Sequence, residues 1–404
     1  MTGEGLPRLM RGASRAAHAG FPWASPRGQG HSAALRVALR KSVIGQWPPA
    51  ARPAARLLML LLWPFESLRD AIATVFGARP EALAGHRRAA IALGAWRAAL
   101  RHNLPPVDFV AYRLFERDRP PAPRWLHSAD AHCHFSALAA PKVRGLARDK
   151  LAFSDLAAGL DMPIMPVLAA WGPDGATREF TEGGPPPEPL VVKPRFGHAG
   201  DGLDFWNWDG TAHAPEARDE RIDLGETFVD WLSRASAERD LIVQTWATAP
   251  DHVGGLHPTE APVISLLSAE WPDGRRALVY AQMLLVAEQG SAERALHLEI
   301  DVASGQVAGL PPGTAAPIWK AARRPPVPVP FAIPAWGEML RSIDRVHDAL
   351  PGAAPVLKWD LLWTRDGIRL LEVNTGPGVF QFQATSLRPL TETPLGDALE
   401  AWAA

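Results

Sequence analysis

Asp366-Gly367 lies between two mostly apolar runs near the carboxyl end of the chain, and it constrains the fold more than any other feature. An Asp-Gly pair in this setting is the strongest short-range signal of a β-hairpin. The two runs, 356–362 and 368–373, are therefore expected to form adjacent antiparallel strands. This pairing predicts that Asp360 and Glu372 lie on neighbouring strands of one sheet.

Oxygen-bearing side chains gather on the predicted hairpin. Glu372 and Asn374 are two residues apart and so share one face of their strand. Together with Asp360 they supply hard oxygen ligands, which Mg²⁺ prefers when it is bound mainly through nucleotide phosphates. The alternative is a polar, solvated face on an edge hairpin. The apolar neighbours Leu361 and Leu371 favour a hairpin that packs on a core.

A second pattern combines a lysine with a glycine-rich loop. The apolar run 190–192 ends on Lys193 and continues into a loop that contains Gly197, Gly200 and Gly202. Backbone N–H groups of such a loop can approach phosphates because no Cβ is in the way. The order of residues is neither that of a Walker loop nor that of a Rossmann fingerprint. A phosphate-binding loop and an ordinary glycine-rich turn both remain open.

The roles of two side chains in or near this loop can be interpreted in two ways. His198 lies within the loop, and Arg195 follows the predicted strand. Each can contact a phosphate or simply face solvent. The aromatic residues Phe205, Trp206 and Trp208 are more typical of core packing than of a stacking platform for a nucleotide.

Short aliphatic runs between Gly- and Pro-rich loops predict more strands beyond residue 120. These predicted strands are 241–243, 263–267, 277–285 and 296–302, with helices at 227–237 and 336–350. The Pro-rich segments 183–189 and 324–334 cannot be interior strands, since each proline removes a hydrogen-bond donor from the ladder. This part of the chain is therefore predicted to mix helices and sheets.

The amino-terminal part has a different character. Residues 1–50 are rich in Gly, Pro, Ser and Arg with little periodicity, and we expect a loosely ordered basic leader. Residues 51–120 have helical spacing of Ala, Leu and Arg. Before residue 125 there are 19 Lys and Arg against 7 Asp and Glu; from there on, 23 against 36. The basic region can dock on the acidic part of its own chain or on an external anion.

The longest apolar stretch, 57–65, is too short for the roughly 20 residues of a membrane-spanning helix. We expect it to be a buried turn of helix, although Arg52 and Arg56 leave a peripheral membrane contact open.

Other features bear on compartment and partners. Cys133 is the only cysteine and the first residues lack an apolar signal, which predicts a cytoplasmic protein. The cluster His132-Cys133-His134 does not have zinc spacing, and we expect it on a loop beside a cleft. The sequence contains no array of basic and aromatic residues, so we expect no nucleic-acid partner.

In order along the chain, these motifs resemble those of the ATP-grasp superfamily, which includes D-alanine–D-alanine ligase. Lys150 and Lys193 match the two lysines that contact nucleotide phosphates in that fold. Asp360, Glu372 and Asn374 match its metal ligands. The resemblance implies an α+β fold whose two lobes clasp ATP.

The resemblance also implies roles for residues outside these motifs. Residues 244–247 match the hinge strand that holds adenine, and Asp251 matches the ribose carboxylate. Lys358 matches a basic position that steadies the reacting centre, and Gly378 matches a backbone donor beside it. The nucleotide contacts implied in this way are Lys150, Lys193, Gly197, Gly200, Gly202, Gln244, Thr245, Trp246, Ala247 and Asp251.

Within the superfamily, the chain is most similar to the sugar-transfer-associated group related to α-L-glutamate ligases. The segments 299–301 and 333–338 carry this likeness, which spans about residues 125–404. Two positions depart from the expected pattern. Ser265 stands where that group is expected to have arginine, and Gln244 stands where many ATP-grasp enzymes have glutamate.

The implied domain is 121–404, with a nucleotide lobe at about 150–250 and a metal-binding lobe at about 255–404, preceded by the helical region 51–120. The implied function is that of a ligase that uses ATP and Mg²⁺, with two ions expected and Mn²⁺ able to substitute. It would activate a carboxylate as an acylphosphate for an amine or another nucleophile, releasing ADP.

The acceptor is an unidentified small molecule, glycan or peptide, and the likeness points to cell-surface polysaccharide or peptide modification. A kinase on the same fold and a non-catalytic ATP-binding scaffold are the alternatives.

Overall fold

The computed structural model describes residues 52–78, 83, 85–102, 104–181, 184–197, 202–215, 227–258, 260–286, 295–307 and 330–403. The described part is α+β, with a helical region that precedes two antiparallel sheets, as the sequence predicts. The predicted leader 1–50 lies outside the described residues.

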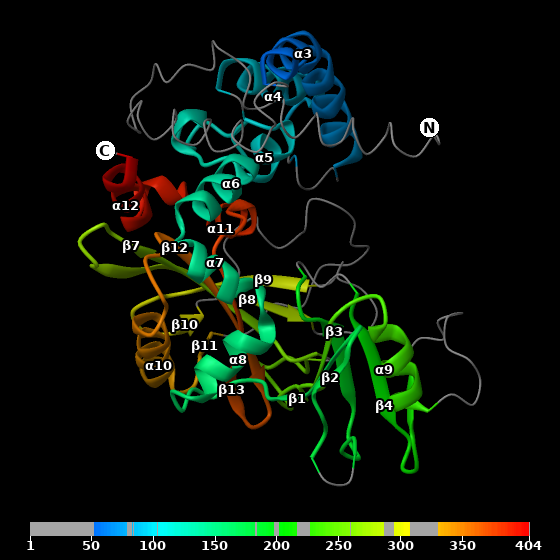
Figure 1. Ribbon diagram of the computed structural model, residues 1–404. Coiled ribbons are helices and arrows are strands. Elements are labelled where there is room, and N and C mark those ends of the chain that lie inside the picture. Colours follow the sequence, from blue (N-terminus) through cyan, green and yellow to red (C-terminus); the bar gives the residue numbers. More distant parts are fainter. Residues whose placement is uncertain are drawn as a thin grey trace, which may run out of the picture.

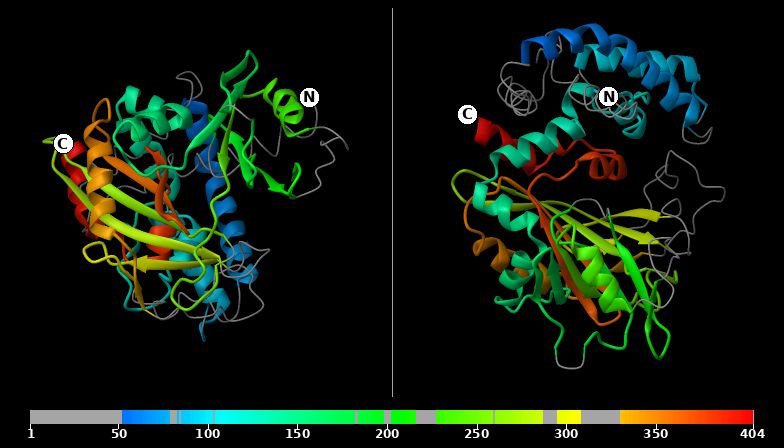
Figure 2. Two further views of the ribbon diagram at one scale, coloured as in Figure 1. Left: turned by 90° about the horizontal axis from the view of Figure 1, so that it is seen from below. Right: turned by 45° about the vertical axis from the view of Figure 1, so that its right-hand side comes forward.

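The helical region begins with α3 (Arg52–Gly77), α4 (Arg88–His102) and α5 (Pro106–Ala111). These three helices lie at the end of the molecule away from the sheets (Figure 1). A short 3₁₀ turn, Ala122–Arg124, leads to α6 (Ser128–Leu138), α7 (Pro141–Arg148) and α8 (Lys150–Ala158). The helix α6 lies between these three helices and the larger sheet in Figure 1 and in the right-hand view of Figure 2.

The smaller sheet has six strands in the order β2-β1-β6-β3-β4-β5. Its strands are β1 (Val167–Gly172), β2 (Gly175–Arg178), β3 (Leu190–Pro194), β4 (Asp204–Trp208), β5 (His213–Pro215) and β6 (Leu241–Thr245), and α9 (Phe228–Ser236) packs against it. Trp206 is buried between Phe228 and Trp231, which confirms core packing for this residue, whereas Phe205 and Trp208 are half-buried.

The larger sheet has seven strands in the order β11-β10-β9-β8-β7-β12-β13. They are β7 (Val263–Glu270), β8 (Arg276–Val286), β9 (Ala295–Ile300), β10 (Gln306–Val307), β11 (Phe331–Ala332), β12 (Val356–Thr364) and β13 (Gly367–Asn374). All strands predicted from the sequence are present. The two-residue strand β11 falls within a predicted Pro-rich connection, at the edge of the sheet where a neighbouring proline is tolerated.

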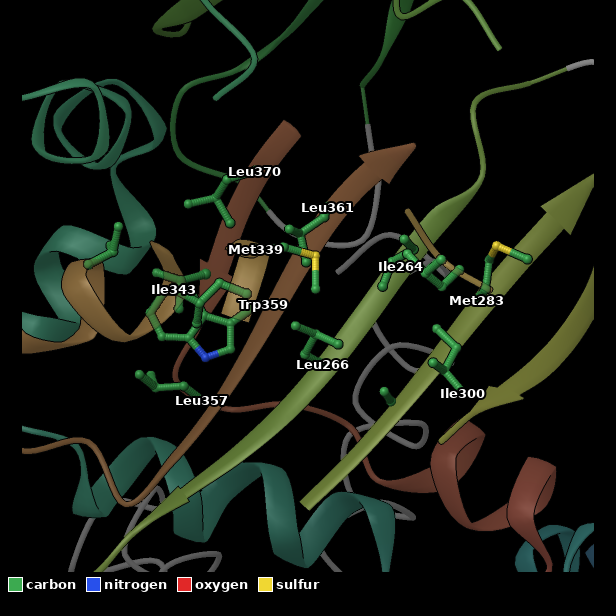
Figure 3. Packing of buried hydrophobic residues seen from close by; sticks show 14 of the residues in the cluster. Ile264, Leu266, Met283, Ile300, Met339, Ile343, Leu357, Trp359, Leu361 and Leu370 are labelled. Carbon is green, nitrogen blue, oxygen red and sulfur yellow. The ribbon is translucent and has the colours of Figure 1, made fainter. Parts of the chain in front are cut away.

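One face of the larger sheet carries the main core. Leu357, Trp359 and Leu361 alternate along β12 and pack with Met339 and Ile343 of α10 (Trp336–Asp348), as Figure 3 shows. Residues between them on β12, including Asp360, therefore lie on the opposite face. The remaining helices, α11 (Phe380–Ser386), the 3₁₀ turn Leu390–Glu392 and α12 (Pro394–Ala403), contribute to a second core that includes Val356.

The two sheets are joined through the segment that leads into β1. Leu370 on β13 accepts a hydrogen bond from Met165 and donates one to the carbonyl of Pro163, at 2.9 and 2.7 Å. This pairing holds the start of the smaller sheet against β13, and so brings β3 near the hairpin β12–β13.

Two sequence expectations are wrong. Residues 61–65 belong to α3, and Trp63 among them is buried, but Leu61 and Phe65 are 61% and 74% exposed, so this part of the apolar stretch is buried on one face only. Helical periodicity shows that a face is apolar but not that a neighbour covers it. The cluster His132-Cys133-His134 lies on α6 and not on a loop.

Candidate active site

The hairpin β12–β13 places the predicted carboxylates directly opposite each other. Asp360 pairs with Glu372, and Lys358 pairs with Asn374, in the register of the two strands. A bulge between Asp360 and Leu361 shifts the register, so that Leu370 faces the core while Glu372 does not. The four polar side chains therefore share the face away from the main core.

Asp360 is the buried centre of this group. Its Oδ1 accepts a hydrogen bond of 2.6 Å from Ser265 Oγ, and its Oδ2 lies 2.9 Å from Lys358 Nζ. The amide nitrogen of Asn374 donates to Asp360 Oδ2 at 3.1 Å and to Glu372 Oε1 at 3.3 Å. Burial raises the pKa of Asp360, and the nearby Glu372 carboxylate raises it further, whereas Lys358 and Ser265 lower it. A cation at this position would relieve the cost of the buried charge.

Ser265, one of the two departures from the resembled pattern, contacts Asp360. The residue stands on β7 directly opposite Asp360, where arginine is expected, and its hydroxyl binds the carboxylate. Only the strand register reveals this contact, because the two residues lie far apart in the sequence.

Two lysines approach the hairpin from the other side. Lys193 on β3 is 7% exposed, and burial lowers its pKa to about 8, while Glu372 raises the pKa and Lys150 lowers it. Burial also lowers the pKa of Lys150, and Glu372 and Asp149 raise it. Both ammonium groups therefore lie within electrostatic range of a carboxylate on the larger sheet.

Lys150 connects α8 to the glycine-rich loop. It is the first residue of α8, whose N-cap Asp149 accepts hydrogen bonds from the backbone of Leu151 and Ala152. Lys150 Nζ donates to the carbonyl of Gly197 at 2.9 Å. Arg195 holds Asp149 through two bonds of 2.7 and 2.6 Å, so its guanidinium is paired rather than simply solvated.

The glycine-rich loop is described only in part. Gly197 ends the described segment after β3, and Gly202, with φ of +75°, begins the next one. His198 and Gly200 lie outside the described residues.

The segment predicted to hold adenine, residues 244–247, forms hydrogen bonds with neighbouring parts of the protein. Gln244 is buried and donates through Nε2 to the carbonyl of Met165 at 2.8 Å. Thr245 ends β6, and the N–H of Trp246 donates to Pro189 at 2.8 Å. Ala247 follows in the segment that leaves the sheet. The Trp246 N–H is thus already paired with the protein.

Asp251 pairs with an arginine rather than with the two lysines. It lies on an exposed segment and forms an ion pair of 3.0 Å with Arg365, which is itself exposed. Gly378 lies in the turn between β13 and α11. His132 on α6 contacts the carbonyl of Gly376 in the same turn, a contact that sequence reasoning missed.

The donor set on the hairpin fits a hard cation bound in part by phosphates. Among the described residues, no group of three or more His, Cys, Asp and Glu side chains could hold a metal ion. Two carboxylates and the Asn374 amide nevertheless converge here, and Mg²⁺ commonly takes one or two carboxylates and completes its shell with phosphate oxygens and water.

Comparisons with solved structures find partial overlaps. The chain is similar to the ATP-grasp ligase PsnB in complex with a minimal precursor, with 14% identity, a TM-score of 0.37, and 68% of each chain covered. It is also similar to the VanG D-Ala:D-Ser ligase of Enterococcus faecalis, with 11% identity, a TM-score of 0.36, and 65% of this chain and 63% of that chain covered. An L-amino acid ligase of Bacillus licheniformis overlaps with 10% identity, a TM-score of 0.36, and 73% and 60% covered.

The chain thus spans about two thirds or less of the length of these structures. No protein-family model matches the chain, and no curated protein matches it.

Proposed function

We propose that the chain is an ATP-grasp enzyme that uses Mg²⁺-ATP to activate a carboxylate, and that the region 121–404 is its catalytic domain. The observation that carries the proposal is the approach of two buried or half-buried lysines, Lys193 and Lys150, to the carboxylate–amide group of Asp360, Glu372 and Asn374. Cations on β3 and α8 and oxygen ligands on the hairpin β12–β13 would bind opposite sides of a polyphosphate.

Each group of residues has a role in this proposal. Lys150 and Lys193 bind phosphate oxygens and offset charge on the phosphoryl group in transfer. Asp360, Glu372 and Asn374 would hold Mg²⁺, which neutralises phosphate charge and orients the transferred group. Lys358 and the backbone donor of Gly378 would steady the reacting centre. The hydrogen bond from Lys150 to the carbonyl of Gly197 ties the start of the glycine-rich loop to α8.

The proposed reaction has two steps. A carboxylate oxygen of the substrate attacks the γ-phosphorus, the bond to the bridging oxygen breaks, and ADP leaves. An amine or other nucleophile then attacks the carbonyl carbon of the acylphosphate, loses its proton, and displaces phosphate. The acceptor is a small molecule, a glycan or a peptide, and a role in cell-surface polysaccharide or peptide modification rests on the sequence resemblance alone.

Mass spectrometry of products separates the three functions that the sequence leaves open. The protein is incubated with Mg²⁺-ATP and a pool of amino acids, amines and uronic acids. A product that has gained one condensation partner supports the ligase. A gain of one phosphate supports a kinase on the same fold, and ATP binding without consumption supports a non-catalytic scaffold.

Lys193→Met supplies the matched control for that assay. This variant keeps an unbranched side chain in the buried position but removes the charge proposed to bind phosphate. Product formation should fall with it, and unchanged product formation would contradict the assignment of Lys193.

A further inference from the structure

The helix α3 carries an exposed apolar stripe, formed by Leu61, Phe65, Leu68, Ile72 and Phe76. These residues recur every three or four positions and so lie on one face of the helix. Six of the nine large apolar side chains that are exposed in the described part of the chain belong to α3, counting Leu62 beside the stripe.

The opposite side of α3 is already buried. Trp63, Ser67, Ala71 and Val75 are almost inaccessible to solvent, and Trp63 donates a hydrogen bond to the carbonyl of Ala99 on α4. The helix is therefore held in place by α4 and α5 while its second apolar face stays uncovered. An exposed apolar band of this kind marks an interaction surface.

The charge of the sequence that precedes and begins α3 favours an anionic partner, while the charged side chains beside the stripe, Glu66, Arg69 and Asp70, pair with one another. In the sequence, residues 1–56, which include the first residues of α3, contain nine Lys and Arg but one Asp or Glu. At the other end of the stripe, the Arg88 guanidinium lies 5.9 Å from the centroid of the Phe76 ring. A basic segment repels the same segment of a second copy, which disfavours a contact between two copies at this end of the chain.

We infer that α3 lies on the surface of an anionic lipid bilayer, with its exposed stripe in the boundary between headgroups and acyl chains. None of the described helices has the combination of length and hydropathy that a membrane crossing requires. An amphipathic helix bordered by basic residues binds such a surface through buried apolar area and through attraction to anionic lipids. The helix α3 lies at the end of the molecule away from the two sheets that carry the candidate active site (Figure 1).

Vesicle flotation with the full-length protein tests the inference. Vesicles of phosphatidylcholine alone are compared with vesicles that contain about one third phosphatidylserine. The protein should float with the anionic vesicles and not with the neutral ones, and binding should weaken as salt is added.

Two double variants isolate the stripe. Phe65→Ser with Ile72→Ser should reduce binding to anionic vesicles at least about tenfold, since two central anchors are lost. Phe196→Ser with Leu203→Ser removes a matched pair of exposed apolar side chains near the glycine-rich loop, and should leave vesicle binding unchanged. Circular dichroism verifies that both variants are folded.

Three results would overturn the inference. The first is a wild-type protein that does not bind anionic vesicles. The second is equal loss of binding in the two double variants. The third is a wild-type dimer in analytical ultracentrifugation that Phe65→Ser with Ile72→Ser converts to a monomer without an effect on vesicle binding, which would assign the stripe to a second copy of the chain.

Discussion

Lys193 on β3 and Glu372 on β13 belong to different sheets, yet the Glu372 carboxylate raises the pKa of the Lys193 ammonium. Burial acts in the opposite direction and is the larger effect, so that the pKa of Lys193 falls to about 8. A buried lysine with a weakly held proton is costly for the free protein, and polyphosphate would offset that cost.

The titration of Lys193 predicts a pH dependence of stability. Between pH of about 8 and 10.5, the folded chain has released this proton while the unfolded chain retains it. Because the unfolded state then binds more protons, the free energy of unfolding rises with pH across this window, by up to about 3 kcal/mol. Urea unfolding measured from pH 7.5 to 10.5 should show the rise in the wild type relative to Lys193→Met. Parallel profiles for the two proteins would contradict the buried charge.

The hydroxyl of Ser265 should support the buried charge of Asp360. Ser265→Ala removes the bond to Asp360 Oδ1 and should lower the free energy of unfolding at pH 7 by about 1–2 kcal/mol. The pKa of Asp360 is raised on folding, so its ionisation opposes folding as pH rises, and protonation favours the folded state. Because the Ser265 hydroxyl stabilises the ionised form of Asp360, the loss of unfolding free energy in Ser265→Ala should be smaller at acidic pH, where Asp360 is protonated. Ser265→Thr retains a hydroxyl and serves as the control; a cost independent of pH would count against the contact.

The turn before β10 should tolerate no side chain at Gly305. Its φ is +73°, and a Cβ there would lie 2.5 Å from Cγ of Trp336, the first residue of α10. Gly305→Ala should destabilise the protein by about 3 kcal/mol or more, through backbone strain and displacement of α10. Gly274 has a similar φ of +83° but open space around it, so Gly274→Ala should cost only about 1 kcal/mol. Thermal unfolding compares the two, and equal losses would show that the Trp336 contact is unimportant.

Local sequence patterns predicted most strands because their signals are local. The Asp366-Gly367 turn defined the hairpin and placed Asp360 opposite Glu372, as the register confirms. The strand β1 was missed because Val167–Gly172 contains small alanines and no alternation of apolar and polar residues.

Contacts between segments far apart in the chain could not be predicted from the sequence. The bonds from Ser265 to Asp360 and from Arg195 to Asp149 depend on strand pairing and on the position of α8, which no local pattern encodes. The exposure of Phe65 was not predictable for the same reason, because helical periodicity indicates an apolar face but not whether a distant segment covers it.

Isothermal titration of Mg²⁺ with a non-hydrolysable ATP analogue tests the central claim most directly. Glu372→Gln with Asn374→Ala removes a charge and an oxygen ligand from the hairpin and should abolish the Mg²⁺-dependent part of binding. Glu338→Gln with Asn207→Ala makes the same chemical changes at two exposed positions outside the hairpin and should bind as the wild type does. If the hairpin variant binds Mg²⁺ and the analogue with wild-type affinity, the assignment of the metal ligands is wrong.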